Sequence, residues 1–167
     1  MSPARIVVMG VSGCGKTTFG KALAEAVGTP FLEGDDCHPP ENVARMVKGQ
    51  PLDDESRKGW LAVIRAHLEN TGQDGLVVSC SALKRIYRDQ LREAGSVLFV
   101  YLKIDYDEAL RRVSARKGHY MPASLVESQF NTLEPPSQDE LFIELDACAP
   151  LAKNLKKTVD FLSHVAF

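Results

Sequence analysis

The sequence predicts an α/β fold in which a parallel sheet is covered by helices on both faces. Short β-rich apolar runs alternate along the chain with longer segments of helical periodicity, which is typical of parallel strands joined by right-handed helical crossovers. The chain has 167 residues, of which 44% are hydrophobic and 25% charged, so it can bury one sizeable core. We therefore expect a single domain that spans residues 1–167.

Five apolar runs are expected to form the strands, and seven segments to form the helices. The strands are Arg5–Met9, Pro30–Glu33, Leu76–Ser79, Val97–Leu102 and Leu141–Leu145. The helices are Thr17–Val27, Pro40–Val47, Glu55–Asn70, Lys84–Ala94, Tyr106–Arg116, Ala123–Thr132 and Leu151–Ser163. In the third helix, for example, the apolar residues recur at helical spacing: Trp60, Leu61, Ile64 and Leu68.

Composition and charge narrow the classes of function. The net charge of −2 argues against broad nucleic-acid binding but leaves room for a small anionic substrate. The four cysteines form no Cys-x-x-Cys pair, so neither a disulfide framework nor a zinc site is expected. The apolar run near the N-terminus is too short for a signal peptide, and no run approaches the ~20 apolar residues of a membrane span. We expect a cytoplasmic protein with no nucleic-acid or membrane partner.

The first strand leads into the stretch GVSGCGKTT at residues 10–18. Its Gly10, Gly15, Lys16 and Thr17 match the pattern Gly-x-x-x-x-Gly-Lys-[Ser/Thr] between a strand and a helix. Glycines let backbone N–H groups curl around an oxyanion, and the helix that follows adds positive charge at its N-terminus. Lys16 can reach the β- and γ-phosphates of a nucleoside triphosphate, and the Thr17 hydroxyl can bind Mg²⁺. A glycine-rich turn that merely connects two elements is the alternative, and the strand–helix context argues against it.

A phosphate-binding loop serves kinases, GTPases and ATP-driven machines, so other features must choose among them. The chain has no Asn-Lys-x-Asp motif for reading guanine, and it is short for most mechanical ATPases. A small-molecule kinase fits the size of the chain best.

The second strand ends in the acidic stretch FLEGDDCHP. Glu33 and Asp35 are two positions apart, so they point the same way at a strand end that borders the ligand crevice. In phosphoryl transfer one carboxylate could hold a water of magnesium, and the other, Asp35, could accept the proton of the attacking hydroxyl. The alternative is a solvated turn in which Asp35 or Asp36 caps the next helix. His38 is either a surface residue or a contact to the substrate.

Basic residues follow the third and fourth strands. Lys84 and Arg88 are four positions apart, so a helix would place both on one face, where they could hold a carboxylate or a phosphate. Arg112 and Arg116 are spaced in the same way and could stack on adenine or meet the γ-phosphate. Residues 116–134 are expected to form a lid that closes over the site. The alternatives are a solvated basic face and a helical hairpin with a basic surface.

Six stretches resemble, in order and spacing, the sequence blocks of the gluconokinase family: GVSGCGKTT, GDDCHPPEN, PLDDESRKGWL, CSALKRIYRDQLR, RKGHYMP and SQFNTLEPP. The resemblance runs from about Ile6 to Pro136. It implies a three-layer P-loop kinase fold with a five-stranded parallel sheet of order 2-3-1-4-5 and a lid. It also implies an enzyme, often a homodimer, that uses ATP and Mg²⁺ to convert D-gluconate into 6-phospho-D-gluconate and ADP.

Carried over position by position, the resemblance assigns roles to single residues. Lys16 and Asp35 would be catalytic, with Asp35 the base at the sugar 6-hydroxyl, and Thr17 would bind the metal. The loop that would bind the ATP phosphates comprises Gly10, Val11, Ser12, Gly13, Cys14, Gly15, Lys16, Thr17 and Thr18, to which the helical spacing adds Arg112 and Arg116. The residues around the substrate would be Asp35, His38, Arg57, Lys84, Arg88, His119 and Gln129.

Departures from related families bear on the choice of substrate. CSAL follows the third strand where shikimate kinases carry a glycine triplet, and nucleoside monophosphate kinases usually have a longer lid and more arginines. Cys14 stands where a serine is common, and Glu33 where relatives often carry Asp. The alternatives left open are a kinase of another small acid or of a nucleoside monophosphate, and a nucleotide-binding switch without turnover.

Overall fold

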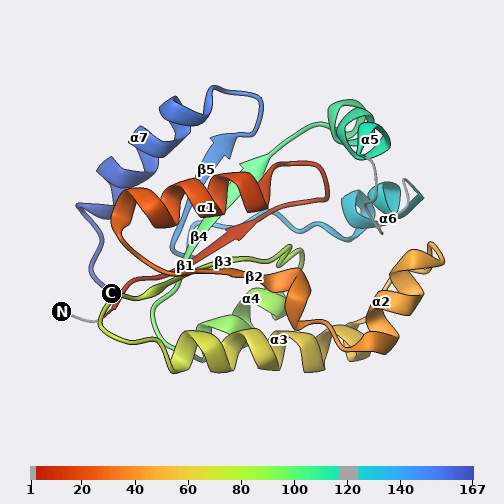
Figure 1. Ribbon diagram of the computed structural model, residues 1–167, viewed down its shortest axis with the longest axis horizontal. Coiled ribbons are helices and arrows are strands. Elements are labelled where there is room, and N and C mark those ends of the chain that lie inside the picture. Colours follow the sequence, from red (N-terminus) through yellow and green to blue (C-terminus); the bar gives the residue numbers. More distant parts are fainter. Residues whose placement is uncertain (1–2, 117–123) are drawn as a thin grey trace.

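A computed structural model describes residues 3–116 and 124–167, and within them five parallel strands form one sheet of order β2-β3-β1-β4-β5 (Figure 1). The strands are β1 Arg5–Met9, β2 Phe31–Glu33, β3 Leu76–Ser79, β4 Leu98–Lys103 and β5 Phe142–Asp146. In the register of the sheet, Val7 of β1 lies beside Val78 on one side and Phe99 on the other. The expected strand order and parallel direction are confirmed.

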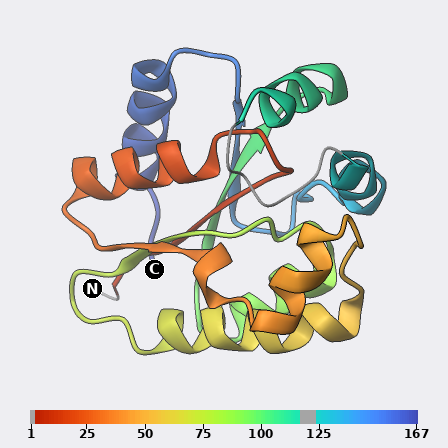
Figure 2. The same cartoon turned by 45° about the vertical axis from the view of Figure 1, so that its right-hand side comes forward.

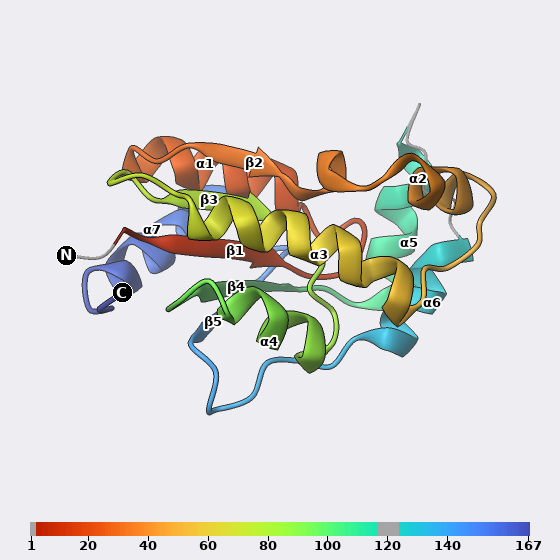
Figure 3. The same cartoon turned by 90° about the horizontal axis from the view of Figure 1, so that it is seen from below.

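Helices cover both faces of the sheet, as the alternating pattern predicts. They are α1 Lys16–Val27, α2 Pro40–Val47, α3 Asp54–Glu69, α4 Arg85–Arg92, α5 Tyr106–Ala115, α6 Ser124–Thr132 and α7 Leu151–Leu162. Helices α1 and α7 pack together on one face, and α3 and α4 pack together on the other (Figures 1 and 3). Helices α2, α5 and α6 lie beyond the end of the sheet toward which the strands run (Figure 2). The segments that leave the carboxyl ends of β1 and β2 therefore lie at this end of the sheet.

Most of the apolar side chains form one core around the central strand. Ile6, Val7, Val8 and Met9 of β1 are fully buried, because helices shield both faces of the sheet. A second, smaller group of buried apolar residues lies apart from this core and is called here the outer apolar cluster: Met46, Leu52 and Leu125. Among the residues that the structure describes, no helix has both the length and the apolar character needed to cross a bilayer.

Two local differences from the expected elements affect the site. A 3-10 helix, η1 Gly34–Cys37, follows β2 where the sequence indicated an acidic strand end or a solvated turn. It starts close to β3, since a Cβ on Gly34 would lie 2.0 Å from the carbonyl oxygen of Ser79. The helix expected from Lys84 begins one residue later, and Lys84 is its N-cap with extended backbone (φ −100°, ψ 152°). The expectation that Lys84 and Arg88 share a helix face is therefore wrong.

Candidate active site

The glycine-rich stretch after β1 forms a loop that ends at the N-terminus of α1. Gly13 has a φ of 89°, and a Cβ there would lie 2.8 Å from the carbonyl oxygen of Ala109. Only glycine suits this left-handed and crowded position. The Nζ of Lys16 donates to the carbonyl oxygens of Gly10 and Val11, at 3.0 Å each, and so lies over the loop. The loop therefore presents backbone amides, a helix N-terminus and an ammonium group together, which suits a chain of phosphates.

A hollow beside this loop contains oxygen ligands of the kind that Mg²⁺ prefers. It is lined by Thr17, Glu33, Asp35 and Arg116, among others. One oxygen of Glu33 accepts from the Thr17 hydroxyl, and the other accepts from the Ser79 hydroxyl at 2.6 Å. No group of three or more His, Cys, Asp or Glu side chains suited to a metal occurs in the described part of the chain. A site with a hydroxyl and one carboxylate fits Mg²⁺, which usually keeps several waters and binds substrate phosphates.

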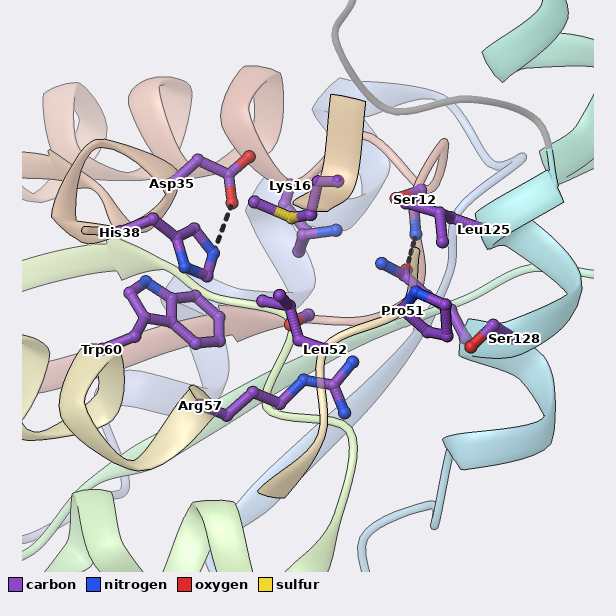
Figure 4. A pocket seen from close by; sticks show the side chains of 13 residues that line it. Ser12, Lys16, Asp35, His38, Pro51, Leu52, Arg57, Trp60, Leu125 and Ser128 are labelled. Atoms are coloured by element: carbon purple, nitrogen blue, oxygen red, sulfur yellow. Dashed lines mark hydrogen bonds and ion pairs between the residues drawn. The ribbon is translucent and has the colours of Figure 1, made fainter. Parts of the chain in front are cut away.

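A second cavity lies between the phosphate loop, α2, α3 and α6, and it joins several of the predicted residues (Figure 4). Its charged side chains are Lys16, Asp35 and Arg57. The other residues that line it are Ser12, His38, Met46, Pro51, Leu52, Trp60, Ser81, Leu125, Ser128 and Gln129. The cavity therefore places a carboxylate and two cations beside a wall of apolar and hydroxyl side chains, which suits a small, polar, anionic molecule.

Arg57 is held at the floor of this cavity by a chain of polar contacts. Arg57 is 7% exposed, and its Nη1 donates to the Tyr87 hydroxyl at 2.9 Å. The Tyr87 hydroxyl donates in turn to Asp54, which also accepts from the Nζ of Lys84 at 3.0 Å. Lys84 does not line the cavity, and its Nζ pairs with the same Asp54 oxygen, Oδ1, that accepts from Tyr87. The structure thus brings Arg57 into the site, and it connects Lys84 to Arg57 through Asp54 and Tyr87.

Arg88 is not at the cavity but inside the protein. Its side chain is 1% exposed, and its Nε donates at 2.7 Å to Glu140, whose side chain is fully buried. Its Nη1 donates to the carbonyl oxygens of Ala82 and Leu83. Burial by itself would raise the pKa of Glu140, but hydrogen bonds from Arg88 and from the Ser137 amide lower it on balance. Arg88 therefore joins α4 to the segment before β5, and we assign it to the fold.

His38 is packed deep in the wall of the cavity. Its side chain is 3% exposed, and its ring stacks on Trp60 with a centroid separation of 4.0 Å. Its Nε2 lies 4.0 Å from the Oδ1 of Asp35 (Figure 4). Burial, with a contribution from the nearby charge of Arg57, lowers the pKa of His38 to about 4. The imidazole is therefore neutral at physiological pH.

The two remaining predicted substrate residues have different outcomes. Gln129 of α6 lines the cavity, and its Oε1 accepts at 2.6 Å from the backbone N–H of Ser12 in the phosphate loop. His119 lies outside the described residues, as do residues 117–123 of the predicted lid. The described part of that lid is Arg116 and residues 124–134, which include helix α6.

A further hollow lies on the opposite side of the phosphate loop, next to the β5–α7 connection. It is lined by Gly13, Cys14, Gly15, Thr18, Phe19, Leu102, Arg111, Arg112, Ala115, Arg116, Ala147, Ala149, Leu151 and Asn154. Arg112 joins its two sides, because it donates to the carbonyl oxygens of Gly13 at 3.2 Å and Ala147 at 3.3 Å. Arg112 also pairs with Glu108, four residues earlier on α5. The location suits the base and ribose of a nucleotide whose phosphates enter the loop.

Sequence reasoning missed several residues that build the site. Trp60 was expected only as a core residue, and Asn42, Ser79 and the β5–α7 connection received no role. The connection could have been found from its place after the last strand, since ligands bind at the carboxyl ends of parallel strands. Asn42 and Trp60 lie in two of the stretches that resemble the gluconokinase family, GDDCHPPEN and PLDDESRKGWL, but their contacts with His38 depend on how α2 and α3 pack.

The fold and the site together define a small-molecule kinase of the P-loop class, and the profile of the shikimate kinase family matches residues 12–148. A gluconokinase of Gluconobacter oxydans is 47% identical over 148 residues, which are 87% of this chain and 83% of that protein. The chain belongs to the gluconokinase family. It is also similar to the crystal structure of a gluconokinase from Sinorhizobium meliloti (44% identity, TM-score 0.84, 97% of each chain). A sugar kinase from Janibacter sp. is similar too (41% identity, TM-score 0.92, 97% of this chain and 95% of that one).

Proposed function

We infer that this chain is an ATP-dependent gluconokinase, which transfers the γ-phosphoryl group of ATP to the 6-hydroxyl of D-gluconate. The observation that carries this function is that Lys16, Asp35 and Arg57 line one cavity beside the phosphate loop. Lys16 would face the phosphoryl group, Asp35 would face the attacking hydroxyl, and Arg57 suits the carboxylate of the substrate. A nucleotide-binding switch without turnover would need neither Asp35 nor Arg57 in this position.

The reaction is a single displacement in which the sugar hydroxyl attacks the γ-phosphorus. The bond from the γ-phosphorus to the oxygen of ADP breaks as the bond to the sugar oxygen forms, and Asp35 accepts the hydroxyl proton. Lys16 neutralises the charge that develops on the transferred group. Holding the hydroxyl in line with the γ-phosphate is the main task of the cavity walls.

ATP and Mg²⁺ are proposed as the phosphoryl donor and the metal. Residues 10–18 and Arg116 would hold the phosphates, while Arg112 braces the loop against the hollow for the base. The Thr17 hydroxyl would bind Mg²⁺, and Glu33 would hold it directly or through a water. When bound, Mg²⁺ would reduce the negative charge that the attacking hydroxyl meets.

The position of gluconate follows from the charges of the cavity. Arg57 is the proposed partner of the gluconate carboxylate, which places the other end of the sugar chain at Asp35 and Lys16. Gln129 is a proposed contact to hydroxyl groups between these ends, and His38, which lies beside Asp35, is a proposed contact to the terminal hydroxyl. Lys84 acts through Asp54 and Tyr87, which hold Arg57 in place.

An ADP-release assay with a panel of acceptors tests this function. We expect turnover with D-gluconate and little with shikimate, other sugar acids or nucleoside monophosphates. Asp35→Asn should lower kcat roughly 10²-fold or more with little change in ATP binding, because it removes a positioned base. Glu41→Gln, a change of an exposed carboxylate on α2, should have no such effect. No turnover of gluconate would refute the function, and normal turnover by the Asp35 variant would move the base to another carboxylate, Glu33 or Asp36.

A further inference from the structure

His38 contacts groups from three elements, and these fix its orientation. Trp60 of α3 stacks on the ring at an interplanar angle of 17°. Asn42 of α2 contacts the Nδ1 atom at 3.2 Å, and Asp35 of η1 faces the Nε2 atom. The charged groups that share the cavity with the ring are Lys16, Asp35 and Arg57. The ring therefore cannot turn over without breaking contacts on both edges.

The orientation of the Asn42 amide follows from its second contact. Its Nδ2 donates at 2.9 Å to the backbone carbonyl oxygen of Ser56, and a carbonyl oxygen can only accept. The nitrogen, and not the oxygen, of the amide therefore occupies this position. Asn42 is 2% exposed, so water does not offer the amide an alternative partner.

This orientation determines where His38 carries its proton. The same Nδ2 atom lies against His38 Nδ1, so its other N–H must donate there, and Nδ1 must be the unprotonated nitrogen. Since the imidazole is neutral, its single proton is on Nε2, the nitrogen that faces Asp35. A buried amide thus selects one of two tautomers.

We propose that Asn42 is a positioning residue, which holds His38 as the Nε2–H tautomer so that this N–H donates to the reactive hydroxyl whose proton Asp35 accepts. The proposal rests on the proposed function, and it extends the site to a residue that touches no reacting atom. The separation of 4.0 Å between Nε2 and Oδ1 is too long for a direct hydrogen bond. One hydroxyl oxygen can nevertheless lie about 2.8 Å from both atoms.

Such a hydroxyl would be fixed by two contacts of opposite sense. It accepts from His38 and donates to Asp35, so its proton points at the base and a lone pair remains for the γ-phosphorus. The other tautomer would present a lone pair at Nε2, which would compete with Asp35 for the proton and turn the hydroxyl away. The tautomer should therefore affect kcat more than the KM for gluconate.

The tautomer can be measured on the free protein by long-range proton–nitrogen NMR of histidine labelled with ¹⁵N. The chain has four histidines, and His38→Gln assigns the signal by its loss. We expect His38 to be neutral at pH 7 with the proton on Nε2. A proton on Nδ1, an equal mixture of tautomers, or protonation near the ordinary histidine pKa would overturn the proposal, whatever the substrate of the enzyme proves to be.

Variants of Asn42 test the cause. Asn42→Asp replaces the donor by an acceptor, so His38 should become protonated on Nδ1, and kcat should fall about tenfold or more while the KM for gluconate changes less. Glu41→Gln on the same helix should leave both the tautomer and kcat unchanged. An unchanged tautomer in folded Asn42→Asp would count against the assignment. If that variant does not fold, the measurement on the natural protein still decides.

Variants of His38 test the donor itself. His38→Gln keeps an N–H that can reach the hydroxyl, whereas His38→Phe keeps the stacking on Trp60 and loses the donor. We expect His38→Gln to retain a larger share of kcat than His38→Phe, each checked for folding by circular dichroism. Equal kcat values in the two folded variants would contradict the donor role. Absence of gluconate turnover in the natural protein would instead refute the proposed function and leave the tautomer result standing.

Discussion

The charged side chains at and near the cavity differ in how completely they are paired with other groups of the protein. Arg57 donates to Tyr87 yet still lines the cavity, so its guanidinium remains within reach of a bound acid. Arg88 is buried with Glu140 and two backbone carbonyls, so its guanidinium is paired inside the protein. The identity of the residue type thus says less about function than the partners that packing provides.

Acid should destabilise the protein through His38. The pKa of this residue is about 4 in the folded chain and near 6.5 when unfolded, because burial and Arg57 disfavour the charged ring. Between these pH values the unfolded chain binds a proton that the folded chain does not. The contribution of His38 to the unfolding free energy is therefore complete above pH 6.5 and falls as the pH drops toward 4. The contribution is roughly 3 kcal/mol at most.

Urea unfolding at a series of pH values measures this effect. The unfolding free energy of the natural protein should fall more steeply below pH 6.5 than that of His38→Gln, whose side chain does not titrate. His67→Gln, which changes an exposed histidine, is the matched control and should behave like the natural protein. Parallel curves for all three proteins would contradict the buried neutral imidazole.

Removal of Arg88 should damage stability and not substrate binding. Arg88→Met leaves the buried Glu140 without its main partner, so the unfolding free energy should fall by about 3 kcal/mol or more. The folded variant should keep its KM for gluconate, because Arg88 does not line the cavity. Arg92→Met, which removes a partly exposed partner of the same carboxylate, should cost less. A large rise in KM with normal stability would return Arg88 to the substrate site.

At the scale of elements, the site is closed by helices that contribute little to the main core. The outer apolar cluster joins α2, the segment before α3, and α6 across the cavity. The same residues therefore pack the helices together and form the apolar wall of the substrate cavity. Gln129 adds a polar link from α6 to the phosphate loop.

Truncation of this cluster should loosen substrate binding more than it weakens the fold. Leu125→Ala removes a side chain that is 4% exposed but lies outside the main core, so the loss in unfolding free energy should be about 2 kcal/mol, at the low end for leucine. The KM for gluconate should rise several-fold. Leu61→Ala in the main core is the control, with a larger stability loss and a KM near normal. The reverse pattern in steady-state kinetics and urea unfolding would show that the cluster does not shape the cavity.

At the scale of the whole molecule, one apolar core extends through both faces of the sheet. It includes Leu23 of α1, Leu61 of α3 and Leu91 of α4 around the central strand, and Leu155 of α7 packs against it. A continuous core of this kind favours cooperative unfolding. The homodimer implied by the resemblance stays a prediction, which light scattering of the purified protein would test.

We expect the chain to unfold in one transition. Trp60 is the single tryptophan, and it connects the core to the site by packing in the core while stacking on His38. Its fluorescence and the far-ultraviolet circular dichroism should therefore report the same midpoint in urea. A fluorescence change at lower urea than the loss of secondary structure would show that the site region unfolds on its own, against the expectation of a single domain.

The sequence by itself determined the features whose residues are neighbours along the chain. The phosphate loop could be predicted because its glycines, Lys16 and Thr17 lie within a few positions of one another. The strands could be predicted because burial on both faces demands continuous apolar runs, as at residues 6–9. The acidic strand end at Asp35 followed from the rule that parallel strands present their carboxyl ends to the ligand.

The tertiary structure alone decided which of the candidate side chains meet. Gln129 reaches Ser12 across 117 positions, and Arg88 reaches Glu140 across 52, so no local spacing could indicate either contact. The spacing of Lys84 and Arg88 was misleading because the helix begins after Lys84. Asn42 gains its role only when α2 packs against α3 and its amide meets both Ser56 and His38. Local sequence limits backbone conformation over a few residues, whereas the packing of distant elements determines where a side chain ends and which atoms it meets.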